Sequence, residues 1–64
     1  MRNKERVLKY GIEVFNNEKD KFSNWLLKPN FYFGGKIPNE LLKTEDGIKQ
    51  VEECLTRIEY GIFS

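Results

Sequence analysis

The last third of this sequence carries the pattern that most limits its fold. Its apolar residues are separated by three, four, three and four positions: Ile48, Val51, Leu55, Ile58 and Ile62. This spacing places them on one stripe of an α-helix, which has to be covered by other parts of the fold. Thr44 is suited to cap the helix, and Gly61 is suited to end it in the left-handed conformation that glycine tolerates. We therefore expect a helix between these two residues, with the stripe in the core.

Two further helices are expected before it. The first runs from Lys4 to Phe15 with Asn3 as its N-cap, and Gly11 in its middle suggests a close helix crossing. The second is expected to open with Asn17 as its cap and to end at Pro29. Its apolar side consists of Phe22, Trp25 and Leu26.

The segment from Pro29 to Lys36 is predicted to be irregular. Asn30 follows a proline and is expected to form a local turn through its side chain, while Gly34 and Gly35 are typical of a tight turn. Pro38 suits the first position of a short helix, because its missing N–H would be unpaired there anyway. The pattern predicts an all-α fold, a small bundle of four helices with one of them short, as a single domain over residues 1–64.

Length and composition exclude several classes of function. A chain of 64 residues with one cysteine and no histidine has no internal disulfide, no usual zinc ligand set and no common general base. We therefore expect neither an enzyme nor a metal or cofactor site. The net charge of +1 argues against nucleic acid as a partner. No apolar run is long enough for a membrane span, so we expect a cytoplasmic protein, and its small core suggests that a partner adds stability.

Two groups of side chains allow more than one interpretation. One strip on the outer face of the last helix carries Lys49, Glu53, Arg57 and Tyr60. This strip is either a solvated row of i,i+4 ion pairs or a contact for a partner. The aromatic run from Phe31 to Phe33 lacks a basic groove for stacking bases, so a satellite core or an interface is the better interpretation. Cys54 has no basic cluster near it in sequence and is interpreted as an inert, buried side chain.

Several clusters, taken in order, resemble a known family. Trp25-Leu26 with Pro29-Asn30 comes first, and Gly34-Gly35 with Pro38 and Leu41-Leu42 follows. Thr44-Glu45-Asp46-Gly47 and the terminal Arg57-Ile58-Glu59-Tyr60-Gly61 complete the pattern. In this order and spacing the chain resembles the toxin-binding domain of Xre/MbcA/ParS-type antitoxins, over about residues 15–63.

The resemblance implies a bacterial domain that forms a homodimer and binds a RES-domain toxin, which consumes or transfers ADP-ribose from NAD. It implies that the end of the last helix covers the mouth of the toxin's NAD pocket. The partner-binding residues would then be Glu53, Arg57, Glu59, Tyr60, Gly61, Ile62 and Phe63. The motif residues Trp25, Asn30, Gly34, Gly35, Pro38 and Gly47 would be structural.

The sequence departs from the family in two places. No DNA-binding helix-turn-helix domain of the kind usual in relatives precedes Met1-Arg2 in this chain, so operator binding is not expected. Ile37 stands where relatives tend to carry a hydroxyl residue, so the short helix lacks a side-chain cap and is expected to fray. The leading hypothesis is steric inhibition of a RES toxin. A helical adaptor or decoy for a different protein and a small DNA-binding regulator are the alternatives.

Overall fold

The computed structural model describes residues 3–61, which form four α-helices and one 3₁₀ turn. The elements are α1 (Lys4–Val14), α2 (Lys19–Leu27), η1 (Phe31–Phe33), α3 (Pro38–Leu41) and α4 (Glu45–Glu59). Over these residues there is no strand, only an isolated antiparallel bridge between Asn30 and Lys36. The predicted all-α fold with one short helix is confirmed.

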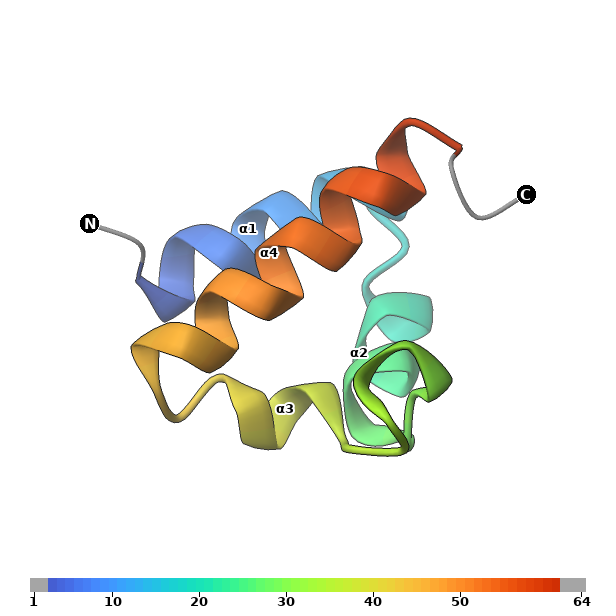
Figure 1. The fold of residues 1–64 in the computed structure, drawn as a ribbon. Helices are drawn as coiled ribbons and strands as arrows, with labels where there is room; N and C mark the ends of the chain where they lie inside the picture. Colours follow the sequence, from blue (N-terminus) through green and yellow to red (C-terminus); the bar gives the residue numbers. More distant parts are fainter. Residues whose placement is uncertain (1–2, 62–64) are drawn as a thin grey trace.

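The helices are arranged around the apolar stripe of α4. Helices α1 and α4 lie side by side, and α2 and α3 pack below that pair in the view of Figure 1. Ile48, Val51 and Leu55 are buried and Ile58 is half-buried, which confirms that the stripe belongs to the core. Ile62, the last member of the predicted stripe, lies outside the described residues. The remaining core side chains are Val7, Phe22, Leu26, Phe33, Leu42 and Cys54.

Helix α1 begins as the sequence predicted, because Asn3 Oδ1 accepts a hydrogen bond of 2.8 Å from the backbone N–H of Arg6. It ends at Val14, one residue earlier than expected, with Phe15 as its C-cap. Asn16 and Asn17 follow with φ of 58° and 64°. Their N–H groups donate back to carbonyl oxygens of the last turn, which is the Schellman arrangement for ending a helix.

The prediction that Asn17 caps α2 is wrong. An N-cap residue needs an extended backbone, and Asn17 is held in the left-handed region by its role at the end of α1. Helix α2 instead begins at Lys19 with Glu18 at the N-cap position, and no side chain caps it. Its other end agrees with expectation, since Lys28 is extended directly before Pro29.

Aromatic rings join α1, α2 and η1. The ring centroids of Phe15 and Phe22 are 5.4 Å apart, and Trp25 lies 5.9 Å from Phe15 and 6.4 Å from Phe33. Gly11 makes room for this cluster, because a Cβ atom there would lie 2.9 Å from Phe22 Cε2 and closer still to Cε1 and Cζ of the same ring. The predicted close approach at Gly11 is therefore present, but its neighbour is a side chain of α2. Trp25 is half-buried and packs against the core.

The turn between α2 and α3 is held in place by hydrogen bonds of its own backbone and of one side chain. Asn30 Oδ1 accepts from the Tyr32 N–H at 2.8 Å, as predicted for a local turn. Gly34 and Gly35 have φ of 68° and 88°, a conformation that explains why glycine occupies both positions. Phe33 is thereby turned into the core, and Phe31 is turned out of it.

Helices α3 and α4 meet through their backbones. Pro38 is the buried first residue of α3, and Ile37 before it forms no side-chain cap, as expected. Thr44 caps α4 by accepting from the Gly47 N–H at 3.0 Å. A Cβ atom on Gly47 would overlap the Leu41 carbonyl oxygen and lie 2.6 Å from its carbonyl carbon. The contact between the two helices therefore requires glycine at this position.

Among the described residues no helix combines the length and the apolar character that a membrane crossing requires.

Candidate functional site

The exposed face at the end of α4 holds several of the residues that the sequence analysis assigned to partner binding. Glu53, Arg57 and Tyr60 are all exposed, and their spacing of four and three residues puts them on the side of α4 opposite the core. Tyr60 is 72% exposed, which is high for a large aromatic side chain. This end of α4 projects away from α3 at the upper right of Figure 1. We call these three residues the α4 end face.

The helix ends directly beside this face. The Tyr60 N–H donates to the Thr56 carbonyl oxygen, and the Gly61 N–H donates to that of Ile58, each at 3.1 Å. Gly61 has φ of 72°, which confirms the predicted left-handed termination. Ile62 and Phe63, also assigned to partner binding, lie outside the described residues.

Ion pairs do not account for the α4 end face. In the part of the chain that the structure describes, the ion pairs are Glu18–Lys21 at 3.2 Å and Glu40–Lys43 at 2.8 Å. Neither includes Arg57, so its guanidinium group is not neutralised by the carboxylate one turn before it. The row of i,i+4 ion pairs considered as the alternative interpretation is therefore not formed.

Glu59 lies on a different side of α4 from Arg57. Its Oε1 accepts a hydrogen bond of 2.6 Å from the hydroxyl of Tyr10 on α1, and the same hydroxyl lies 3.3 Å from Thr56 Oγ1. Burial and this bond to Glu59 raise the pKa of Tyr10. Glu59 therefore helps to hold the end of α4 against α1. The sequence analysis did not foresee this link, because nothing in the spacing of Tyr10 and Glu59 reveals which helices become neighbours.

Cys54 has no surface exposure and lies in the core. Burial raises the pKa of its thiol to about 11, although the positive charge of Arg57 acts in the opposite direction. A thiol of this kind is protonated near neutral pH and is a poor nucleophile. The prediction that Cys54 is buried is confirmed, and the raised pKa supports its interpretation as an inert side chain.

A hollow of about 350 Å³ lies between α2, η1 and the last turns of α4. It is lined by Trp25, Asn30, Phe31, Tyr32 and Ile58. Phe31 is 97% exposed, although the turn that carries it is well pinned. The sequence analysis left this aromatic run between a satellite core and an interface. The structure divides it, with Phe33 in the core and Phe31 on the surface.

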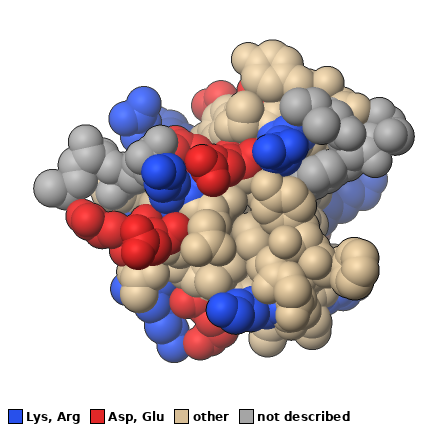
Figure 2. Space-filling view, in the orientation of Figure 1, with Lys and Arg blue, Asp and Glu red and all other residues tan. Residues whose placement is uncertain are grey.

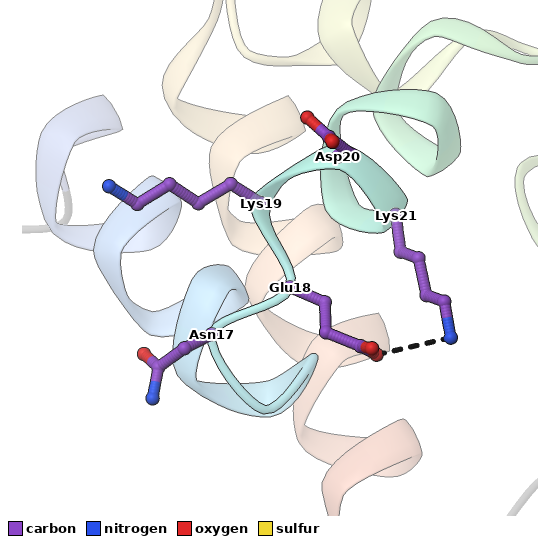
Figure 3. Close-up of a pocket in the computed structure, with 5 residues that line it drawn as sticks. All are labelled: Asn17, Glu18, Lys19, Asp20 and Lys21. Carbon is purple, nitrogen blue, oxygen red and sulfur yellow. Dashed lines mark ion pairs between the residues drawn. The ribbon is translucent and has the colours of Figure 1, made fainter.

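A second hollow, at the start of α2, is less suited to be a binding site. Residues 17–21 line it, and Figure 3 shows that Asn17 and Lys19 extend away from the Glu18–Lys21 ion pair. These side chains carry charges of both signs and do not converge on a common point. Over residues 3–61 no cluster of three or more His, Cys, Asp or Glu side chains is arranged to hold a metal ion. Neither set of lining residues brings together a nucleophile and a base.

Comparison with known proteins gives one consistent answer. Residues 11–61 match the family described as the antitoxin Xre/MbcA/ParS C-terminal toxin-binding domain. The chain is 37% identical over 59 residues to an antitoxin Xre of Photorhabdus laumondii and 34% identical over 59 residues to one of Yersinia enterocolitica. Each alignment covers 92% of this chain and 40% of the relative.

An antitoxin Xre of Pseudomonas putida is 41% identical over 49 residues, which cover 77% of this chain and 31% of that protein. The chain thus spans less than half the length of these curated relatives. No solved structure matches it. The family is one of binding domains, which agrees with the expectation that the chain is not an enzyme. The family match spans most of the chain and contains the whole α4 end face, and the chain therefore belongs to the family of Xre/MbcA/ParS antitoxin C-terminal toxin-binding domains.

Proposed function

We propose that this chain is the toxin-binding part of an antitoxin, that it acts in the bacterial cytoplasm, and that its partner is a RES-type toxin that consumes NAD. Bound to the toxin, it covers the mouth of the NAD site and excludes the substrate. Support comes from the family, whose description is that of a toxin-binding domain, and from relatives named antitoxin Xre. The observation that carries the proposal is the exposure of Arg57 and Tyr60, three residues apart, at the end of α4.

Arg57 and Tyr60 have the chemistry of interface anchors. An arginine guanidinium can donate two parallel hydrogen bonds to one carboxylate, and Arg57 has no ion-pair partner among the described residues. The tyrosine ring offers a large contact area with a polar tip, and both residue types are enriched at the energetic centres of protein interfaces. Occlusion requires no reactive group, which fits a chain without histidine.

The other assigned residues take more limited parts in the proposal. Glu53 lies on the same face as Arg57 and can accept from a donor of the partner. Glu59 accepts one hydrogen bond from Tyr10, and its remaining acceptor sites can serve the partner. Gly61 follows the face directly, and the resemblance assigns Ile62 and Phe63, which lie outside the described residues, to the same contact.

A homodimer is part of the same proposal, as the resemblance implies. So small a chain buries a modest fraction of its surface, and association would bury more of it. Sedimentation velocity over a range of concentrations tests this part. We expect a concentration-dependent shift from monomer to dimer, and a monomer at all concentrations would contradict it.

The experiment is co-purification of the chain with the RES-domain toxin encoded nearest to it, followed by an assay of NAD loss. We expect stable co-elution and suppressed NAD loss with the unaltered chain. Arg57→Ala and Tyr60→Ala should each weaken binding by about 2 kcal/mol, or about 30-fold, because they remove interface anchors. Lys49→Ala is the matched control, since Lys49 is exposed on the same side of α4 two turns earlier.

Circular dichroism checks that each variant remains folded. Failure of the unaltered chain to bind the toxin would refute the choice of partner. Binding that survives both alanine substitutions together would refute the α4 end face as the site. Equal losses for Lys49→Ala and Arg57→Ala would indicate a general charge effect and would also count against the site.

A further inference from the structure

The hollow between α2, η1 and α4 has an apolar rim that the fold leaves uncovered. Phe31 is 97% exposed, and Trp25 and Ile58 are only half-buried. Figure 2 shows a broad uncharged surface in the centre and right of the view, over the region between α4 and η1. Contiguous exposed apolar patches of several hundred Å² on a monomer often mark a binding site.

The exposure of Phe31 does not come from a loose loop. The Gly35 N–H donates to the Asn30 carbonyl oxygen at 2.9 Å, and the Asn30 side chain accepts from Tyr32 at 2.8 Å. Phe33 anchors the turn from the inside, with its ring edge-on to Tyr32 at 5.1 Å. The backbone therefore presents Phe31 in a fixed direction, which lowers the entropy lost when a partner binds.

Asn30 adds a polar group to the hollow. Because the Tyr32 N–H can only donate, the atom that faces it must be the carbonyl oxygen of the Asn30 side chain. The amide nitrogen then points the other way, and no described residue accepts from it. It is suited to hold a backbone carbonyl of a bound segment.

The size of the surface argues for part of a larger interface. Four apolar side chains that each expose part of their area provide on the order of 400 Å², whereas a stable interface buries about 800 Å² on each partner. Ile58 lines the hollow from the inner side of α4, whereas Arg57 and Tyr60 lie on the outer side of the same last turns. A contact at the hollow would therefore add to the contact at the α4 end face rather than coincide with it.

The surrounding charge indicates the chemistry of that partner. Residues 21–39 contain three lysines and no acidic residue, and Lys28, Lys36 and Arg57 are all exposed. In Figure 2, Lys and Arg side chains lie at the upper and lower edges of the uncharged surface, with Asp and Glu side chains next to them and at its left. A symmetric contact with a second copy would bring these positive charges together, which is unfavourable. A segment with acidic residues around an apolar side chain is complementary.

We propose that the hollow lined by Trp25, Asn30, Phe31, Tyr32 and Ile58 receives an apolar side chain of the toxin, carried on a segment with acidic residues beside it. This inference rests on the proposed function and adds a second contact to the α4 end face. The apolar side chain supplies affinity, and the lysines guide the approach of the acidic segment.

Binding of the RES-domain toxin to chain variants tests this inference, with isothermal titration calorimetry for affinity. Phe31→Ala should weaken binding at least about tenfold without loss of thermal stability, because the side chain contributes little to the core. Leu27→Ala is the matched control, since Leu27 is 61% exposed on α2 and does not line the hollow. Lys28→Glu combined with Lys36→Glu should slow association and reduce its dependence on salt.

A second measurement uses the single tryptophan of the chain. In the ¹⁵N-labelled chain, the indole N–H resonance of Trp25 should shift when unlabelled toxin is added. Toxin binding that is unchanged by Phe31→Ala and leaves this resonance in place would overturn the inference while the proposed function stands. Loss of self-association in Phe31→Ala with intact toxin binding would assign the hollow to a second copy and would also overturn it. Failure of the unaltered chain to bind toxin would refute both the proposed function and this inference.

Discussion

Replacement of Gly47 by alanine is the most direct test of how α3 and α4 meet. Gly47 is buried in the first turn of α4, where a Cβ atom would overlap the Leu41 carbonyl oxygen. It would also lie 2.6 Å from the Leu41 carbonyl carbon and 3.0 Å from its Cα, and real Cβ atoms essentially never approach closer than 3.0 Å. The obstacle is backbone, so no side-chain rotation relieves the overlap and the two helices have to separate.

Two opposing terms set the magnitude. In an unobstructed helix, alanine is favoured over glycine by about 1 kcal/mol. Overpacking of a well-filled contact costs about 1 to 3 kcal/mol, and separation of the helices also strains the Thr44 cap, which is worth about 1 kcal/mol. We expect a net loss of about 2 kcal/mol in the free energy of unfolding, which lowers the Tm of so small a domain by about 10 °C.

The assay is urea and thermal denaturation followed by circular dichroism at neutral pH. Gln50→Ala, at an exposed position of the same helix, is the control for helix propensity and should change stability by less than about 0.5 kcal/mol. Gly11→Ala should cost less than Gly47→Ala, because the ring of Phe22 is a side chain that can shift. A Gly47→Ala variant as stable as the original chain, or more stable, would refute the backbone contact between α3 and α4.

Two further predictions concern α4. Thr44→Ala removes the cap on the Gly47 N–H and should lower the free energy of unfolding by about 1 kcal/mol. Thr44→Ser keeps the hydroxyl and should retain most of that stability. Equal losses for the two variants in urea denaturation would argue against the cap. The second concerns Cys54, whose pKa burial raises from 9.0 to about 11. Because the folded state favours the neutral thiol, the contribution of Cys54 to the free energy of unfolding is complete below pH 9. It falls by about 2 to 3 kcal/mol as the pH rises towards 11. Cys54→Ala should flatten this decline in denaturation curves between pH 9 and pH 11, and an unchanged slope would show that Cys54 is not its source.

The local features of the chain were largely predictable because neighbouring residues determine them. The caps at Asn3 and Thr44, the end of α4 at Gly61 and the glycine turn before α3 each depend on a few consecutive residues. The one incorrect cap, Asn17, shows the limit of such patterns. Asparagine suits both a helix start and a left-handed helix end, and the preceding helix selected the second role.

The candidate site was predictable only in part. The period of α4 placed Glu53, Arg57 and Tyr60 on its outer face, and the structure agrees. The same period could not reveal that Glu59 is held by Tyr10, because that bond joins residues 49 positions apart. Nor could it reveal the hollow, whose walls come from α2, η1 and α4.

The sequence by itself determined the helices, most of their ends and the family to which the chain belongs, since these depend on short-range order along the chain. The tertiary structure decided which side chains are buried in the core, which line the hollow and which are exposed. Gly47 is required because α3 lies against it, and Phe31 is exposed because a pinned turn directs Phe33 inward. The physical reason is that a residue's neighbours in space depend on how helices pack, and packing is a property of the whole core rather than of any one segment.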